Sequence, residues 1–450
     1  MGILSFLKSK PEPEPAPASA PRAAAPKAAA TPAAAPAGGI SNAEANAIVA
    51  RAEIVDERHR LCGYRFSVPY GGSRLPLPEP QFIETLVAAD VPGFAQRRLA
   101  LVQLSADAIF FNRHLPLMAP HTIFLLDRCH GNLPQDQLAG RMTALRETGC
   151  QVALRGISAV EDQAPLLAVC DVAVLALGEH SLAEFQTLTR QLRTQYPKMK
   201  LLVDGVESWD EQRMCLAWGC HYFMGHFLTT ADKIDPDAKI DQSRLTSIEL
   251  LNLLRSDAEL SEMIEVAKRD PGMTYQVLQW ANAPSNGQTS KVTSLNQAFM
   301  VLGRNQLYRG LTVSMFRLGG GANKDRDESL LEVALTRARF METVAKGLPQ
   351  AKRDELFLVG LLSLFDVLLG VPMANLVGKM HLSDEIRDVL LQSEGPYGPY
   401  LMLVLLLERD KVERACEVAQ SVQIDPETLG PTASAAFKWA QESIGMTASE

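Results

Sequence analysis

Short apolar runs alternate with amphipathic segments from about Asn46 to Met224. Strands that alternate with helices predict a parallel sheet, and this number of units predicts a closed (β/α) barrel. In such barrels the chemistry lies at the carboxyl ends of the strands. The predicted strands are Ala50–Val55, Cys62–Val68, Leu99–Leu104, Thr122–Asp127, Val152–Leu154, Val172–Leu177, Leu201–Val203 and His221–Met224. The predicted helices include Pro80–Ala89, Gln135–Thr148, Leu182–Tyr196 and Ser208–Trp218.

The second half of the chain has a different pattern, that of consecutive amphipathic helices with strong stop signals. Ser256 and Glu259 form a predicted capping box, and Pro271 is predicted to end the helix that follows. Ser294 is predicted to cap the next helix, which we expect Gly303 to end. The fold class expected for the whole chain is therefore α/β plus all-α: a barrel followed by a helical bundle.

Composition sets limits on domains, partners and location. The 450 residues suit two to three domains, and we predict an Ala/Pro-rich disordered tether over 1–45, a barrel over 46–232 and a helical domain over 233–450. A net charge of −8 predicts no nucleic-acid partner. The apolar run Leu401–Leu407 is too short for a membrane span. Seven cysteines without a CxxC pair favour a reducing, cytoplasmic location.

The helical half carries a motif series that resembles the HDOD domain. The matching residues are Asp270-Pro271, Leu278, Ala281-Asn282-Ala283, Ser294-Leu295, Ala298 and Leu302-Gly303. The resemblance implies a regulatory module related to the helical HD phosphohydrolases but without their metal site. The residues agree, since His381 is the last histidine and the only one after His226, whereas an HD-type site needs several His and Asp ligands.

The first half resembles the EAL domain, a barrel that hydrolyses cyclic di-GMP in bacterial signalling. The best-matching pieces are Gly63-Tyr64, the segment from Leu145 to Leu154, and Leu201–Glu207 with Gly219 and Gly225. The resemblance implies a site that holds two divalent cations with carboxylates, aided by Asn, Lys and Gln, and that activates water.

Most ligands of that site have been replaced in this chain. Arg65 stands at the place of the motif Glu, and Gln103 at the place of the Asn. In IFLLD, Phe124 or Leu126 falls at the place of another Glu, while the Asp-Asp pair has become Arg155-Gly156. The remaining correspondences are Val174 for the Lys, Ala176 for the following Asp, and Met224 for the Gln, so that only Asp204 and Glu207 keep acidic character.

A later segment joins the two resemblances. Glu355–Asp366 is similar to the GLLSLLD segment of bacterial proteins that link a degenerate EAL domain to an HDOD domain, with Ser363 at the place of a ligand His.

Two arginines at the expected cation site argue against metal binding. A guanidinium about 4 Å from a unit positive charge raises the energy of that charge by ~4 kcal/mol at an effective dielectric of 20. Arg65 and Arg155 therefore oppose cation binding. We therefore predict no catalytic residue, no metal, no cofactor and no enzymatic activity.

Two classes of function are compatible with these residues. The favoured one is a regulatory protein in or near cyclic di-GMP signalling that docks another signalling protein, mainly through the part from Asp237 onward. The alternative is a receptor that binds cyclic di-GMP through Arg65 and Arg155 without cutting it, and a residual phosphodiesterase is a further alternative. The sequence leaves the partner and the oligomeric state open.

Overall fold

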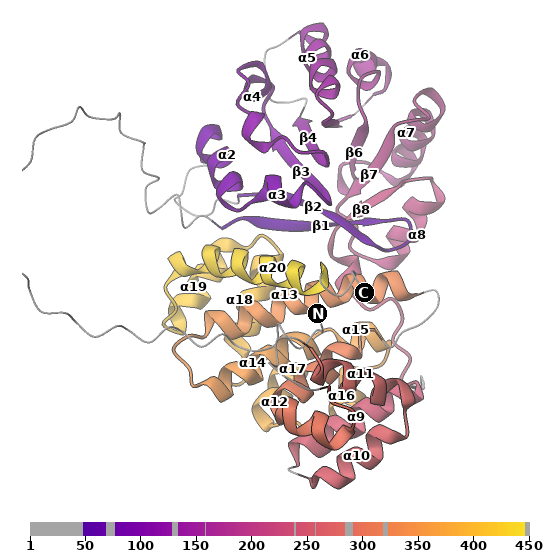
Figure 1. Ribbon diagram of the computed structural model, residues 1–450. Helices are drawn as coiled ribbons and strands as arrows, with labels where there is room; N and C mark the ends of the chain where they lie inside the picture. The colour runs from indigo at the N-terminus through magenta and orange to yellow at the C-terminus, as the bar shows by residue number, and fades with distance from the viewer. Residues whose placement is uncertain are drawn as a thin grey trace, which may run out of the picture.

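The structure is a computed structural model, and it describes residues 48–68, 77–127, 134–157, 159–237, 240–256, 258–283, 291–317 and 323–445. The predicted tether over 1–45 and the glycine run Gly319–Gly321 lie outside these ranges. An eight-stranded closed barrel forms one half and a helical assembly forms the other (Figure 1). The predicted fold class is confirmed.

The barrel contains every predicted strand, in chain order around the closed sheet. The strands are β1 (Ala50–Asp56), β2 (Leu61–Ser67), β3 (Leu99–Leu104), β4 (Thr122–Asp127), β5 (Gln151–Arg155), β6 (Val172–Ala176), β7 (Lys200–Asp204) and β8 (Tyr222–Met224). The barrel interior is apolar, with Ile54, Leu101, Leu125, Val174 and Met224 among its buried residues.

The expectation of a wholly parallel sheet is wrong for β1, which runs antiparallel to both β2 and β8. The reason is the short connection between β1 and β2, which leaves no room for a crossover helix. Asp56 closes this turn by accepting hydrogen bonds from the backbone N–H groups of Arg58 and Arg60.

Helices cover the outside of the barrel between its strands. They are α2 (Glu79–Ala88), α3 (Val91–Phe94), α4 (Ala106–Phe110), α5 (Gln135–Glu147), α6 (Ala164–Leu167), α7 (Leu182–Gln195) and α8 (Trp209–Ala217), followed by the short 3₁₀ helix η5 (His226–Thr229). Ser181 with Glu184 and Ser208 with Glu211 form capping boxes that start α7 and α8. Local side-chain chemistry therefore sets where these helices begin.

The helical half runs from α9 to α20. Its helices are α9 (Gln242–Arg255), α10 (Leu260–Lys268), α11 (Pro271–Ala281), α12 (Leu295–Ser314), α13 (Lys324–Val344), α14 (Gln350–Leu362), α15 (Phe365–Leu369), α16 (Met373–Val377), α17 (Asp384–Gln392), α18 (Gly398–Glu408), α19 (Val412–Ser421) and α20 (Leu429–Gly445). Each helix of the described ranges is too short or too polar to cross a bilayer.

Two helix boundary signals act differently from the prediction, and a third acts as predicted. Ser256 is the C-cap of α9, and Glu259 is the N-cap of α10 without a side-chain cap bond, so the predicted box is absent there. Pro271 starts α11 rather than ending α10, because a proline at the first helical position has no N–H to satisfy. Gly303 ends the helix that Ser294 starts, as predicted, because its φ of 66° and ψ of 167° are non-helical and α12 consists of two helices that meet at this kink.

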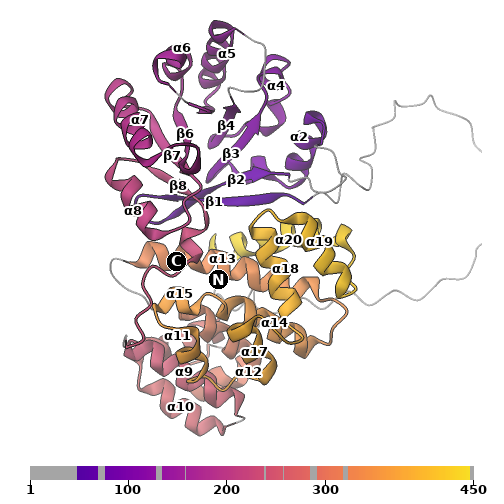
Figure 2. The same ribbon diagram turned by 180° about the vertical axis from the view of Figure 1, so that it is seen from behind.

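The β1–β2 hairpin lies against α13, α18 and α20 (Figures 1 and 2). The Tyr64 hydroxyl donates to Glu332 of α13 at 2.6 Å, and Arg51 lies 4.4 Å from the ring centroid of Phe437 in α20. One continuous buried cluster includes Phe66 of the barrel and Phe340 of the helical half. The two halves therefore share a core, and the predicted boundary at 232/233 falls in the connection between η5 and α9.

Candidate functional site

Two arginines and one aspartate meet at the carboxyl ends of the barrel strands. Asp204, the last residue of β7, accepts from Nη1 of Arg65 at 2.8 Å and lies 3.6 Å from Nη1 of Arg155. Arg65 comes from β2 and Arg155 ends β5, so the fold joins three strands that are far apart in sequence. The Nε atom of Arg65 is buried without a hydrogen-bond partner.

Further carboxylates lie beside this cluster. Glu179 pairs with Arg155 at 3.2 Å, and Glu207 pairs with Nδ1 of His226 at 3.1 Å. We call the group formed by Arg65, Arg155, Glu179, Asp204 and Glu207 the barrel mouth. Arg65 and Arg155 are only 21% and 26% exposed, so their charges are partly removed from water and interact strongly with an anion.

The other predicted site positions contribute little polar chemistry to the mouth. Val174 and Met224 are buried in the barrel interior, and Ala176 is the register partner of Asp204. Gln103 is exposed near the end of β3. Gly156 follows β5 with φ 75°, and its carbonyl accepts from Gln163.

The predicted alignment on β4 is off by one residue. Phe124 and Leu126 pack on the outer side of the sheet, whereas Leu125 belongs to the barrel interior. Side chains alternate along a strand, so the inward positions are odd-numbered here. The backbone of Asp127, the last residue of β4, pairs in register with Arg155. Applying the two-residue period to IFLLD would have placed Leu125 rather than Phe124 or Leu126 on the inner side.

The donor set at the mouth does not fit the two-cation site that the EAL resemblance implies. Asp204 is occupied by two guanidinium groups. Within the described ranges, no cluster of three or more His, Cys, Asp or Glu residues is arranged to hold a metal ion.

The HDOD motif residues shape the helices rather than forming a polar site. Asp270 caps α11 by accepting from the N–H groups of Gly272 and Met273. The Asn282 amide bridges to the backbone of Val292 through two hydrogen bonds of 2.8 Å. Ser294 caps α12 by accepting from the N–H of Gln297 at 3.3 Å.

A cavity of about 240 Å³ lies between η5 of the barrel and the helical half. His226 and Thr230 line one side, and Arg337, Ser363 and Asp366 line the other. We call it the junction cavity. Burial raises the pKa of the Asp366 carboxyl, whereas the charge of Arg337 lowers it. The segment that resembles GLLSLLD therefore faces the barrel.

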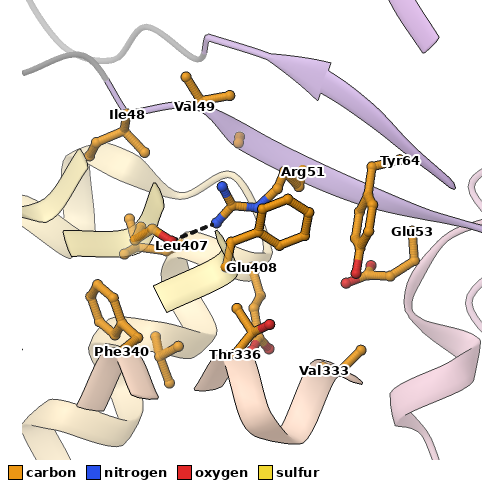
Figure 3. A pocket seen from close by; sticks show the side chains of 14 residues that line it. Ile48, Val49, Arg51, Glu53, Tyr64, Val333, Thr336, Phe340, Leu407 and Glu408 are labelled. Carbon is orange, nitrogen blue, oxygen red and sulfur yellow. Dashed lines mark hydrogen bonds between the residues drawn. The ribbon is translucent and has the colours of Figure 1, made fainter. Parts of the chain in front are cut away.

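A smaller cavity of about 60 Å³ lies where β1 packs on α13, α18 and α20 (Figure 3). Glu53 points into this region near Glu408, while Arg51 donates to the carbonyl of Ala433 at 3.3 Å. Burial raises the pKa of Glu53 to about 7. No sequence pattern marked this carboxylate, because its burial comes from the packing of the two halves.

Comparison with known proteins matches residues 246–372 to the HDOD domain. Uncharacterized protein YuxH of Bacillus subtilis is 24% identical over 308 residues, which cover 67% of this chain and 74% of YuxH. Cyclic di-GMP phosphodiesterase CdgJ of Vibrio cholerae is 23% identical over 337 residues, which cover 73% of this chain and 76% of CdgJ. Both alignments are long enough to extend beyond the HDOD domain.

Among solved structures, the Bacillus subtilis YkuI protein with an EAL domain, in complex with substrate cyclic di-GMP and calcium, is similar. The TM-score is 0.35 at 13% identity, covering 58% of this chain and 74% of that one.

The prediction that the chain has no enzymatic activity is contradicted by these comparisons. CdgJ, whose alignment covers 73% of this chain, is named a cyclic di-GMP phosphodiesterase. The prediction rested on comparing ligand positions with the EAL pattern, and carboxylates such as Asp204 and Glu179 remain at the mouth. Loss of the pattern is therefore no argument against activity. The chain contains an HDOD domain over residues 246–372, preceded by a closed eight-stranded barrel.

Proposed function

We propose that this chain is a regulatory protein of cyclic di-GMP signalling whose barrel mouth binds the dinucleotide through Arg65 and Arg155. The observation that carries the proposal is the convergence of the two guanidinium groups on Asp204, at 2.8 and 3.6 Å. Guanidinium groups match the geometry of phosphate oxygens, and cyclic di-GMP presents two phosphodiester anions. In this proposal a phosphodiester displaces Asp204 as the partner of the arginines.

Calorimetric titration of the full chain with cyclic di-GMP tests this proposal. We expect Arg65→Ala and Arg155→Ala each to weaken binding roughly tenfold or more, as for a lost hydrogen bond to a charged group. Arg146→Ala is the matched control, because Arg146 pairs with Asp171 at 2.9 Å and is absent from the mouth. Equal affinity in all variants, or no binding by the wild type, contradicts the proposal.

Hydrolysis of cyclic di-GMP is a second candidate function, and the name of the Vibrio cholerae relative favours it. Chromatography of the same samples, incubated with magnesium or manganese, measures it directly. A linear product that disappears with Asp204→Asn but persists with Arg146→Ala supports hydrolysis at the mouth. An intact dinucleotide after long incubation of the wild type removes this candidate.

We also propose that the HDOD domain docks another signalling protein. Tyr275 of α11 and Met300 of α12 are 65% and 67% exposed on two helices that pack together. Exposed large apolar side chains on neighbouring helices suit an amphipathic helix of a partner. A pull-down of interacting proteins tests this proposal. The full chain is used as bait, because the two halves share a core.

The control for docking is a substitution of an exposed apolar residue on the barrel. Tyr275→Ser with Met300→Ser should abolish capture of the partner, whereas Phe111→Ser, which alters a side chain of the barrel that is 59% exposed, should retain it. Capture that survives the double substitution places the docking surface elsewhere.

A further inference from the structure

The loop after β7 and the helix after β8 are joined tightly at the barrel mouth. The Val206 N–H donates to the carbonyl of Met224 at 2.9 Å, and the Phe227 N–H donates to the carbonyl of Val206 at 3.4 Å. A Cβ on Gly225 would lie 2.0 Å from the Val206 carbonyl oxygen, so only glycine permits this approach. A displacement of Asp204 or Glu207 therefore moves η5 with it.

The other side of η5 contacts the helical half. Phe227 and Leu228 are buried, and His226 lines the junction cavity while it pairs with Glu207. The Trp209 indole donates to the carbonyl of Thr230 at 2.8 Å, which fixes the end of η5. His226 thus connects Glu207 of the barrel mouth to the junction cavity.

The opposite wall of the cavity is a buried polar network. Arg337 of α13 is 4% exposed and pairs with Glu408 of α18 at 2.8 Å. Its Nη1 also donates to the Ser363 hydroxyl at 2.7 Å, which connects α13 to the end of α14. Because Arg337 bonds to both residues and the network connects three helices, a displacement of Glu408 also displaces Ser363.

We propose that η5 couples occupancy of the barrel mouth to the α14–α15 wall of the junction cavity. The proposal rests on the proposed binding of an anion at Arg65 and Arg155 and concerns its regulation. An anion that takes the place of Asp204 releases the loop that carries Glu207 and with it His226, which pairs with Glu207. Because His226 lines the junction cavity, the change reaches its opposite wall at Ser363 and Asp366.

Amide hydrogen exchange of the full chain tests the coupling without any ligand. Arg65→Ala should speed exchange in α15 and at the end of α18 roughly threefold or more, within the range for coupling through packed networks. Arg146→Ala should leave both segments unchanged. The coupling is overturned if α15 of the Arg65→Ala variant exchanges at the wild-type rate. It is also overturned if Arg146→Ala has the same effect as Arg65→Ala.

Coupling between two sites is reciprocal, so the second arm starts from the cavity. Ser363→Ala, which removes the hydroxyl that Arg337 contacts, should change the affinity for cyclic di-GMP by roughly threefold in calorimetry. Equal affinity overturns the coupling. If the wild type binds no cyclic di-GMP, the proposed function fails by itself, and the exchange measurement still decides the coupling.

Discussion

At the scale of single residues, the structure places the Glu53 carboxylate in a largely desolvated position at the contact between the two halves. Arg51 donates to the carbonyl of Ala433 and Arg337 pairs with Glu408, so both guanidinium groups bond to groups other than Glu53. Burial is the largest cause that raises the pKa of Glu53 to about 7, and Glu408 raises it further, whereas His226 and Arg51 lower it. Tyr64, the remaining titratable neighbour, lines the same cavity.

This raised pKa predicts how stability depends on pH. The folded state binds a proton at Glu53 that the unfolded chain releases near pH 4.5, so the folded state loses relative stability as pH rises from about 4.5 to about 7. We expect Glu53→Gln to stabilise the protein by ~2 kcal/mol at pH 8, after allowance for partial exposure, and to have little effect at pH 4.5.

Urea unfolding at several pH values measures this difference. The control is Glu57→Gln, which changes an exposed residue of the β1–β2 turn. A Glu53→Gln stability difference that stays constant between pH 4.5 and 8 contradicts the prediction.

At the scale of elements, α12 consists of two helices that meet at a kink at Gly303, where the sequence predicts a stop. The backbone at Gly303 has φ 66° and ψ 167°, a combination that is almost restricted to glycine. The second helix carries Leu307 and Leu311 into the core. Burial of this second part offsets the interruption of the hydrogen-bond ladder.

Gly303→Ala should therefore destabilise the protein, by about 1–3 kcal/mol, although a Cβ at this position meets no atom within 4 Å. Gly347→Ala is the control, since that glycine also has open space but an ordinary φ. Thermal denaturation compares the two variants. Equal melting temperatures would show that backbone strain at Gly303 is small.

At the scale of the whole molecule, one buried carboxylate holds the barrel on the helical half. Glu332 is 5% exposed and accepts from the Tyr64 hydroxyl at 2.6 Å and from Arg98 at 2.8 Å. Both donors belong to the barrel, whereas Glu332 belongs to α13. Removal of one partner of a buried ion pair leaves an uncompensated charge.

Glu332→Ala should lower the stability by ~3–5 kcal/mol and weaken the cooperativity between the two halves. Differential scanning calorimetry should show one transition for the wild type and a broadened or divided transition for the variant. As a control, Glu328→Ala changes an exposed residue on the same helix. A single sharp transition at the wild-type temperature in Glu332→Ala would contradict this role.

The sequence by itself determined which elements form. Every predicted barrel strand is present, and Ser208 with Glu211 starts α8, because side-chain alternation and capping depend on neighbours in the chain. The resemblance to the EAL domain singled out Arg65, Arg155 and Asp204, which the fold brings together. Their functional roles stay predictions.

Only the tertiary structure decided how these elements act together. The antiparallel β1, the inward side of β4 and the burial of Glu53 depend on packing between segments that are distant in sequence. The same holds for the salt bridge between Arg65 and Asp204, which are 139 positions apart. Local periodicity carries no information on such pairs, because the free energy of burying a charge is set by whatever the fold places around it.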